Sequence, residues 1–244
     1  MRVYREWPAH AALSHLVVCT WVDPGRPRRP PVLPDTCIDL VWDGARLRVA
    51  GPDTRPVPVL GEATYTGLRF KPGAAPGVLG VPASELVDRT VALAELWGPD
   101  ADELAERLWE EPARARQLLE RAIVARPAPA PHPLVRELLH RLSRHDAGGV
   151  VAGRLTQELG VSDRTLRRHC EQAIGYGPKM VERVLRGRRA LRLIRSGVAL
   201  AEAAARAGYA DQAHLSHEVR RLAGGAPGQL RRLPELVISA NGYP

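Results

Sequence analysis

The chain is short of cysteine, and the few cysteines it has stand far apart. Cys19, Cys37 and Cys170 are the only three among 244 residues. They form neither the even, clustered set of a disulfide framework nor a CxxC pair that holds a metal. This excludes a small fold held together by disulfides. We therefore expect a reducing, cytoplasmic compartment and neither a bound metal nor a cofactor.

Long apolar runs are missing too. No stretch approaches the roughly 18 apolar residues that a membrane-spanning helix needs. The N-terminal MRVYREWPAH lacks the uninterrupted apolar segment of a signal peptide. We expect no membrane partner. Hydrophobic residues still make up 45% of the chain, which favours packed cores over disorder.

Lysine is nearly absent, so arginine carries almost all of the positive charge. The net charge of +8 is unevenly distributed. Residues 134–244 hold 19 Arg or Lys against 10 Asp or Glu, whereas residues 1–133 hold 16 against 17. A basic part beside a nearly neutral one is typical of a protein that binds a polyanion and has a separate second task.

The first part of the chain is predicted to be rich in short strands. Expected strands cover residues 16–22, 37–42, 47–50, 57–60 and 65–70, separated by Asp-Pro-Gly, Asp-Gly and Pro-Gly turns. Asp43-Gly44 is a strong hairpin signal. Strands of this length and spacing suggest a small barrel or sandwich.

The hydrophobic period changes near residue 100. Leu104 and Leu108, and then Leu119 and Ile123, indicate two amphipathic helices. These helices are candidates for dimerisation or for covering the strands. PAPAPHP at 127–133 is a stiff, extended linker. Beyond it every segment reads as helix.

Two similar segments in the basic part each have the outline of a helix-turn-helix. They read LTQELGVSDRTL from residue 155 and AAARAGYADQAHL from residue 203. Each consists of a short helix, a glycine turn, a polar N-cap and a second helix, and the second helix of such a unit enters the DNA major groove. Residues 178–195 form a helix of about 27 Å between them. Both units can therefore sit on one face of DNA, about one helical turn apart.

The predicted fold class is therefore α+β. A β-rich, barrel-like regulatory domain is expected over residues 1–98, and a helical connector with the proline-rich linker over residues 99–133. Residues 134–244 are expected to form an all-α domain with two helix-turn-helix units joined by a long helix.

The side chains expected to touch DNA lie on the two recognition helices. Ser162 and Asp211 are the predicted N-caps. Leu166 and Leu215 mark the buried faces, so the polar residues opposite them face outward. Arginine suits guanine or phosphate, glutamine suits adenine, and alanine suits the thymine methyl group. The predicted DNA-binding residues are Arg164, Thr165, Arg167, Arg168, Gln212, Ala213, Ser216, His217, Arg220, Arg221 and, on the long helix, Arg186.

These residues and their spacing resemble the AraC/XylS family of transcription regulators. The pattern covers about a third of the chain, from residue 150 to 232, and its positions are Leu166-Arg167-Arg168, Gly175, Pro178, Arg186, Ala190, Ala204, Gly208-Tyr209, Gly224, Pro227 and Arg231. The N-terminal run LPDTCIDLVWDG resembles an actinobacterial subgroup of such regulators. The resemblance implies a DNA-binding domain with two helix-turn-helix units, preceded by a β-rich domain that binds an effector or dimerises.

The chain departs from the family pattern at five positions. Aromatic residues are usual where Cys170, Val181, Val219 and Leu230 stand, and arginine is common in place of His217. Smaller core residues let the helices lie closer together or pack less firmly. Because histidine replaces the usual arginine at His217, the family's base preference does not carry over to this position.

We interpret the chain as a transcription regulator that is not an enzyme. Its expected partners are promoter DNA, a small-molecule effector, RNA polymerase and a second copy of the chain. Candidate effector-binding aromatics are Trp21, Trp42, Tyr65 and Phe70. The aspartates at 35, 39, 43 and 53 are expected to cap turns.

Two other interpretations stay open. One is a sensor protein whose helix-turn-helix units make protein contacts. The other is a DNA-repair or alkyl-transfer enzyme, for which Cys37 would be the residue to examine.

Overall fold

The N-terminal half of the computed structural model is built on one antiparallel sheet. The structure describes residues 3–25, 31–59, 62–143 and 151–231. Within them the strands are β1 (Arg5–Pro8), β2 (Val17–Asp23), β3 (Asp39–Trp42), β4 (Leu47–Ala50), β5 (Tyr65–Phe70) and β6 (Thr90–Ala92). Their order across the sheet is β1-β2-β5-β3-β4-β6, so β1 and β6 form its two edges.

The strands at 47–50 and 65–70 have the predicted bounds, and Asp43-Gly44 turns the hairpin between β3 and β4. The segment at 57–60 is not a strand in its described part, because Val57 makes only an isolated bridge with Val32. Strands β1 and β6 were not predicted. Both are short edge strands, which leave a weak pattern in a sequence.

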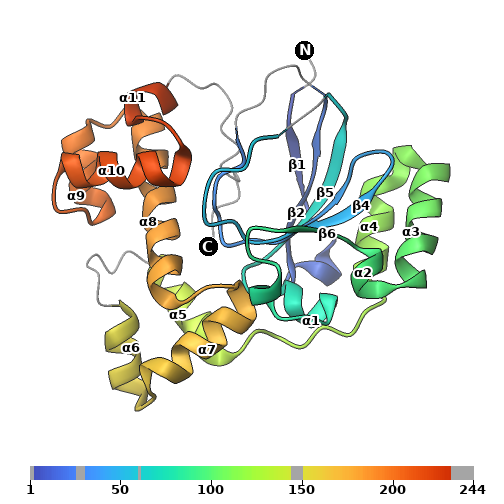
Figure 1. The fold of residues 1–244 in the computed structure, drawn as a ribbon, viewed down its shortest axis with the longest axis horizontal. Helices are drawn as coiled ribbons and strands as arrows, with labels where there is room; N and C mark the ends of the chain where they lie inside the picture. The colour runs from blue at the N-terminus through green and yellow to red at the C-terminus, as the bar shows by residue number, and fades with distance from the viewer. Residues whose placement is uncertain (1–2, 26–30, 60–61, 144–150, 232–244) are drawn as a thin grey trace.

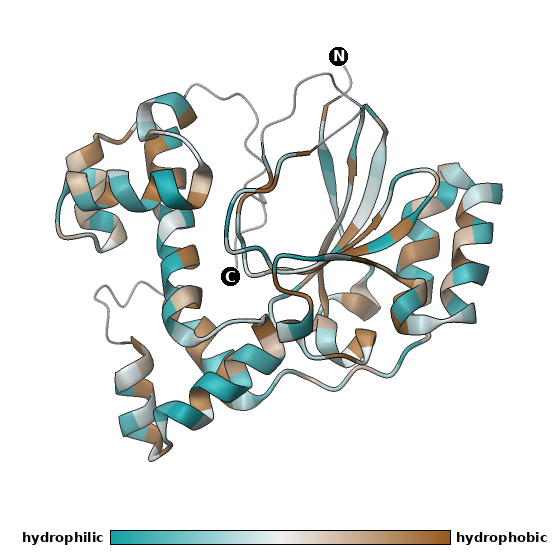
Figure 2. Cartoon of the chain, in the orientation of Figure 1, coloured by the Kyte–Doolittle hydropathy of each residue, from teal (hydrophilic) through white to brown (hydrophobic). Residues whose placement is uncertain are grey.

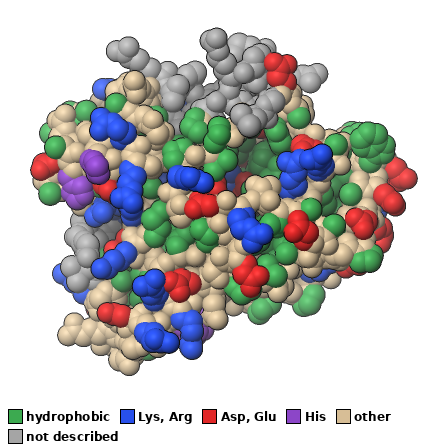
Figure 3. Space-filling view, in the orientation of Figure 1, with side chains coloured by type: hydrophobic (Ala, Val, Ile, Leu, Met, Phe, Trp, Pro, Cys, Tyr) green, Lys and Arg blue, Asp and Glu red, His purple; other side chains and the backbone are tan. Residues whose placement is uncertain are grey.

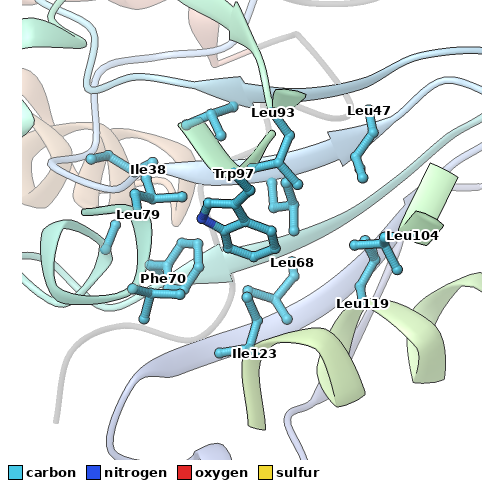
Figure 4. Packing of buried hydrophobic residues seen from close by; sticks show 14 of the residues in the cluster. Ile38, Leu47, Leu68, Phe70, Leu79, Leu93, Trp97, Leu104, Leu119 and Ile123 are labelled. Atoms are coloured by element: carbon cyan, nitrogen blue, oxygen red, sulfur yellow. The ribbon is translucent and has the colours of Figure 1, made fainter. Parts of the chain in front are cut away.

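Alternation along the strands gives the sheet two unlike faces. Leu40, Trp42, Leu68 and Phe70 point to one side and are fully or almost fully buried. Helices cover that side: α1 (Ala75–Leu79), α2 (Ala94–Trp97), α3 (Pro99–Glu110) and α4 (Ala115–Val124), with single 3-10 turns at Ala11–Leu13, Ala83–Glu85 and Pro112–Arg114. Figure 4 shows Trp97 among the side chains of this core.

Helices α3 and α4 belong to the same core as the sheet, since Leu104, Leu108, Leu119 and Ile123 are all buried in it. Figure 2 shows their brown, apolar sides turned inward and their teal sides turned outward. Of the two roles open for these helices, the structure shows that they cover the strands. Trp109 at the end of α3 is 70% exposed.

The described residues of the C-terminal half contain helices and no strand, which confirms the α+β class. Its helices are α5 (Pro133–Ser143), α6 (Val151–Leu159), α7 (Asp163–Ile174), α8 (Pro178–Arg195), α9 (Leu200–Ala207), α10 (Gln212–Ala223) and α11 (Pro227–Leu230). The pairs α6–α7 and α9–α10 are the two helix-turn-helix units, and α8 joins them (Figure 1). Helix α8 has the predicted bounds. No described helix is long and apolar enough to cross a membrane.

Both recognition helices begin as the sequence indicates. The Ser162 side chain accepts a hydrogen bond from the backbone N–H of Thr165, and the Asp211 side chain accepts one from that of His214. Gly160 and Gly208 adopt left-handed backbone in the two turns, which glycine tolerates best. The caps and turns therefore follow from local chemistry alone.

Figure 1 places the C-terminal helices on the side of the sheet opposite α3 and α4. Leu33 belongs to the hydrophobic cluster of the second unit, and Gly224 at the end of α10 lies near Pro56. The backbone carbonyl of Asp35 accepts a hydrogen bond of 3.2 Å from Arg188 on α8. The two N-terminal loop stretches 32–37 and 51–57, here called the loop pair, thus contact both the second unit and α8.

The first unit docks through Gly175, at the end of α7. A Cβ atom at Gly175 would lie 2.7 Å from Val87 Cγ2 and 2.8 Å from Pro52 Cγ. The residue also has a φ of +100°. Only glycine lets α7 end this close to the N-terminal domain.

Replacing this glycine tests the docking contact. Gly160→Ala is a matched control, because Gly160 also has positive φ but no atom within 4 Å of its would-be Cβ. We expect Gly160→Ala to lower the free energy of unfolding by about 1 kcal/mol, the cost of left-handed backbone. Gly175→Ala should lower the free energy of unfolding further, because its Cβ atom would also clash with Val87 and Pro52. Urea denaturation measures both, and equal losses would contradict close docking.

Candidate nucleic-acid interface

The first recognition helix presents an arginine-rich face. Leu166, Cys170 and Ile174 are buried as predicted. Arg164, Arg167 and Arg168 are exposed, and Thr165 is half-buried beside the N-cap, its hydroxyl 2.9 Å from that of Ser162. At spacings of three and four residues the three arginines share one side of α7.

These three arginines differ in their partners. Arg167 is paired with Glu171, one turn along the helix, at 2.7 Å. Arg164 and Arg168 form no salt bridge within the described part of the chain. They can therefore meet a phosphate or a guanine without breaking an ion pair.

The second recognition helix presents a milder surface. Leu215, Val219 and Leu222 are buried as predicted. The outer residues Gln212, Ala213, His217, Arg220 and Arg221 are exposed, and Ser216 is half-buried. This helix offers amide, methyl, hydroxyl and imidazole groups along its first two turns, with its arginines in the last turn.

Arg186 on α8 lies in a different setting from the other candidates. Its guanidinium carbon stands 4.8 Å from the centre of the Tyr209 ring. Its Nε is buried and has no hydrogen-bond partner in the described residues. Arg186 is therefore half-buried between α8 and the turn of the second unit, whereas the arginines of the two recognition helices are exposed.

Two contacts fix the second recognition helix to α8. Arg183 on α8 donates two hydrogen bonds to the Glu218 carboxylate on α10, at 2.6 and 3.1 Å. Four residues along α8, a Cβ atom at Gly187 would lie 2.4 Å from Leu222 Cδ1. The helices lie close together here, as the small residues in this core allow.

Charge separates over the molecule as the sequence indicates. In Figure 3 the Lys and Arg side chains gather over the half where Figure 1 places α7, α8 and α10, and Asp and Glu gather at the far edge over α3 and α4. A basic face around two recognition helices suits a polyanion.

The face of the sheet away from helices α1 to α4 holds a cavity of about 370 Å³. Trp21 and Tyr65 line it. Trp42 and Phe70 point to the opposite face and are packed in the core. The four candidate effector-binding aromatics are thus divided between the two sides of the sheet.

Arg69 is the centre of the charged residues around this cavity. Its guanidinium donates to both carboxylate oxygens of Asp39, at 3.0 and 2.9 Å. Carboxylate oxygens of Asp35 and Glu6 each lie 3.6 Å from it. Burial would lower the pKa of Arg69, but the Asp39 and Asp35 carboxylates outweigh burial and raise it. The side chain therefore stays charged inside the protein.

The four aspartates expected to cap turns have different roles. The Asp35 carboxylate accepts a hydrogen bond from the backbone N–H of Cys37. The Asp43 carboxylate accepts hydrogen bonds from the backbone N–H groups of Ala45 and Arg46. Both aspartates therefore cap turns. Asp39 lies within a strand and binds Arg69 instead. Asp53 lines the cavity.

Sequence reasoning missed Arg69 and Tyr4, which also lines the cavity. Arg69 stands between apolar residues in a predicted strand, and that signal could have singled it out. Its partners depend on strand order, which no local pattern reveals.

The cysteines bear on the alkyl-transfer interpretation. All three are buried free thiols. Burial, helped by the Asp35 carboxylate, raises the pKa of the Cys37 thiol well above its usual value. Because the thiolate is the reactive form, this setting disfavours Cys37 as a nucleophile. Nor do the described residues bring together three His, Cys, Asp or Glu side chains that could hold a metal.

Two family models match separate parts of the chain. Residues 155–233 match a helix-turn-helix domain, and residues 5–92 match a domain of unknown function, DUF6597. No curated protein sequence matches the chain.

Several solved structures are similar at low identity. The C-terminal domain of AraT, a response regulator from Geobacillus stearothermophilus, is 23% identical, with 46% of this chain and 94% of that chain covered and a TM-score of 0.40. An apo variant of ToxT from Vibrio cholerae is 10% identical, with 92% and 98% covered and a TM-score of 0.47. ToxT with a bound unsaturated fatty acid is 10% identical, with 87% and 94% covered and a TM-score of 0.45. Likeness at this level identifies no ligand of this chain.

The ion pair between α8 and α10 gives a pH-dependent prediction. Burial alone would raise the pKa of Glu218, but the hydrogen bonds and charge of Arg183 outweigh it and lower the pKa. A carboxylate with a lowered pKa in the folded state adds stability at neutral pH, and that stability is lost on acidification below about pH 4.5. We expect Glu218→Gln to unfold more easily at pH 7 and to lose less stability between pH 5 and pH 3.

Glu202→Gln is the control, because Glu202 pairs with Arg206 on an exposed surface, where such pairs contribute little. Thermal unfolding followed by circular dichroism from pH 3 to pH 7 gives both comparisons. If Glu218→Gln and Glu202→Gln lose the same stability on acidification, the ion pair between α8 and α10 does not contribute to the stability of the fold.

Proposed function

We propose that this chain is a DNA-binding transcription regulator that reads promoter DNA with both of its helix-turn-helix units at once. Residues 155–233 match a helix-turn-helix domain, and their residue pattern resembles the AraC/XylS family. The single observation that carries the proposal is the set of exposed arginines on α7. They lie on a recognition helix, on the side away from its core, in the basic half of the chain.

The proposed operator is asymmetric. The first unit offers Arg164, Arg167 and Arg168, which suit guanine edges and phosphates. The second unit offers Gln212, Ala213, Ser216 and His217, which suit adenine, a thymine methyl group and weaker contacts, with Arg220 and Arg221 toward the phosphates. Helix α8 spans about 27 Å by its 18 residues. The two half-sites are expected about one helical turn apart.

We further propose that the N-terminal domain controls this binding, through a ligand, through self-association or through both. The loop pair supports this proposal because it touches the second unit at Leu33 and the first unit at Pro52. A change in these loops therefore acts on both units. A second copy of the chain and RNA polymerase are proposed protein partners, and the exposed Trp109 on α3 is a candidate contact.

Substitution of one arginine tests direct readout. We expect Arg168→Ala to weaken binding to a duplex selected from random DNA by about 1–3 kcal/mol, while binding to unrelated DNA changes little. If Arg168 contacts a phosphate, affinity falls for all sequences and the salt slope drops by about one. Fluorescence anisotropy at several salt concentrations measures the affinity for both duplexes and distinguishes a base contact from a phosphate contact.

Arg114→Ala removes an exposed arginine far from the recognition helices and serves as the control. If Arg168→Ala binds the selected duplex as tightly as the control does, Arg168 has no role in the interface.

A further inference from the structure

We propose that the cavity on the face of the N-terminal sheet away from helices α1 to α4 binds a small organic cation that carries both an apolar body and a hydrogen-bond acceptor. Binding itself is independent of the proposed function. The regulatory effect of such a ligand rests on that function.

Charge on the wall favours a cation. Among the described residues, five aspartates and two arginines line the cavity. Each arginine already has a carboxylate partner: Arg69 binds Asp39, and Arg48 lies 3.0 Å from Asp43. Asp53 has no hydrogen bond or salt bridge to any described residue. A positive ligand would give this carboxylate the partner that the described residues do not supply.

The cavity wall also carries aromatic rings. Tyr4 and Trp21 lie with ring centroids 6.0 Å apart, and Tyr65 completes the aromatic part of the wall. Aromatic faces attract cations, most strongly where water is excluded. A volume of about 370 Å³ falls within the size range of small-molecule sites.

The polar atoms of Arg69 define the second feature of the ligand. Its side chain is 5% exposed, and Nη1 has no hydrogen-bond partner among the described residues, although Glu6 lies 3.6 Å away. A neutral oxygen of the ligand would satisfy this donor. An anionic ligand is disfavoured, because three carboxylates already surround Arg69.

The titration of Asp53 agrees with this geometry. Burial, followed by the charges of Asp35, Asp88 and Asp39, raises the pKa of Asp53 to about 7, against the opposing effect of Arg55. A bound cation stabilises the carboxylate form. Affinity for a cation should therefore be full above pH 7 and fall as the pH drops through 7.

The same wall faces the DNA-binding domain. The Asp35 side chain lines the cavity while its backbone carbonyl accepts from Arg188 on α8. Asp53 follows Pro52, which contacts the end of α7 at Gly175. A ligand that draws Asp35 and Asp53 inward would therefore shift the contacts of α7 and α8.

A series of three probes with the same body tests the charge requirement. Tyramine carries an ammonium group and a phenol oxygen, 4-ethylphenol lacks the charge, and 4-hydroxyphenylacetate reverses it. Titration calorimetry with the full-length protein at pH 8 should show tyramine binding at least about tenfold more tightly than 4-ethylphenol. The anion should bind more weakly still. Failure of tyramine to bind, or equal affinities across the series, overturns the proposal.

Asp53→Asn keeps the shape of the side chain and removes its charge. We expect it to lose at least about tenfold in tyramine affinity, to leave 4-ethylphenol binding unchanged, and to abolish the fall in tyramine affinity between pH 8 and pH 6. Asp102→Asn, on the exposed side of α3, is the control and should change nothing. Unchanged tyramine binding by Asp53→Asn, with an unchanged melting curve, refutes the site.

DNA binding is measured separately, so the two proposals fail separately. Tyramine should shift the affinity of the wild type for its selected duplex and leave Asp53→Asn unaffected. If tyramine binds but does not change the affinity for DNA, the proposed site is supported and its proposed effect on DNA binding is refuted. Tyramine binding by a protein that selects no DNA keeps the site and refutes the proposed function.

Discussion

A buried guanidinium is the constraint on which the N-terminal domain depends. Arg69 stands near the C-terminal end of β5 with its side chain 5% exposed, and an isolated charge that is buried in this way would strongly destabilise the folded state. Carboxylates from β1, β3 and the loop before β3 compensate it. The charge network therefore favours β3 beside β5 and holds the Asp35 loop next to the sheet. The cavity and the contacts with α8 are consequences of that placement.

The loop pair lies between the cavity of the N-terminal domain and the helices of the C-terminal domain, and its residues contribute to both. On one side it supplies aspartates to a cavity lined by aromatic rings. On the other it supplies Leu33 to the core of the second helix-turn-helix unit and Pro52 to the end of α7. A single residue separates the cavity from the C-terminal domain at Asp35. Its side chain lines the cavity, and its backbone carbonyl accepts a hydrogen bond from Arg188 on α8.

The sequence predicts local features well and spatial ones poorly. The caps at Ser162 and Asp211, the bounds of α8 and the strand at 65–70 follow from spacing, capping chemistry and turns. Strand order does not, since it depends on contacts between distant segments. Tyr65 and Phe70 show what alternation alone could have revealed: five positions apart on one strand, they face opposite sides. The pairing of Arg69 with Asp39 requires β5 to lie beside β3, which no local signal specifies.

The shared core around Leu33 limits how freely the two halves can be exchanged between proteins. Leu33 is an N-terminal residue, yet it is packed with Ala190, Tyr209 and Leu215 in the hydrophobic cluster of the second unit. A chimera joined at the proline-rich linker would keep the chain continuous but replace one side of that cluster. The proline-rich linker therefore separates the two halves along the sequence, but the hydrophobic core of the second unit includes a residue from each half. Exchanging the N-terminal half alone would therefore change a side chain inside the hydrophobic core of the C-terminal half.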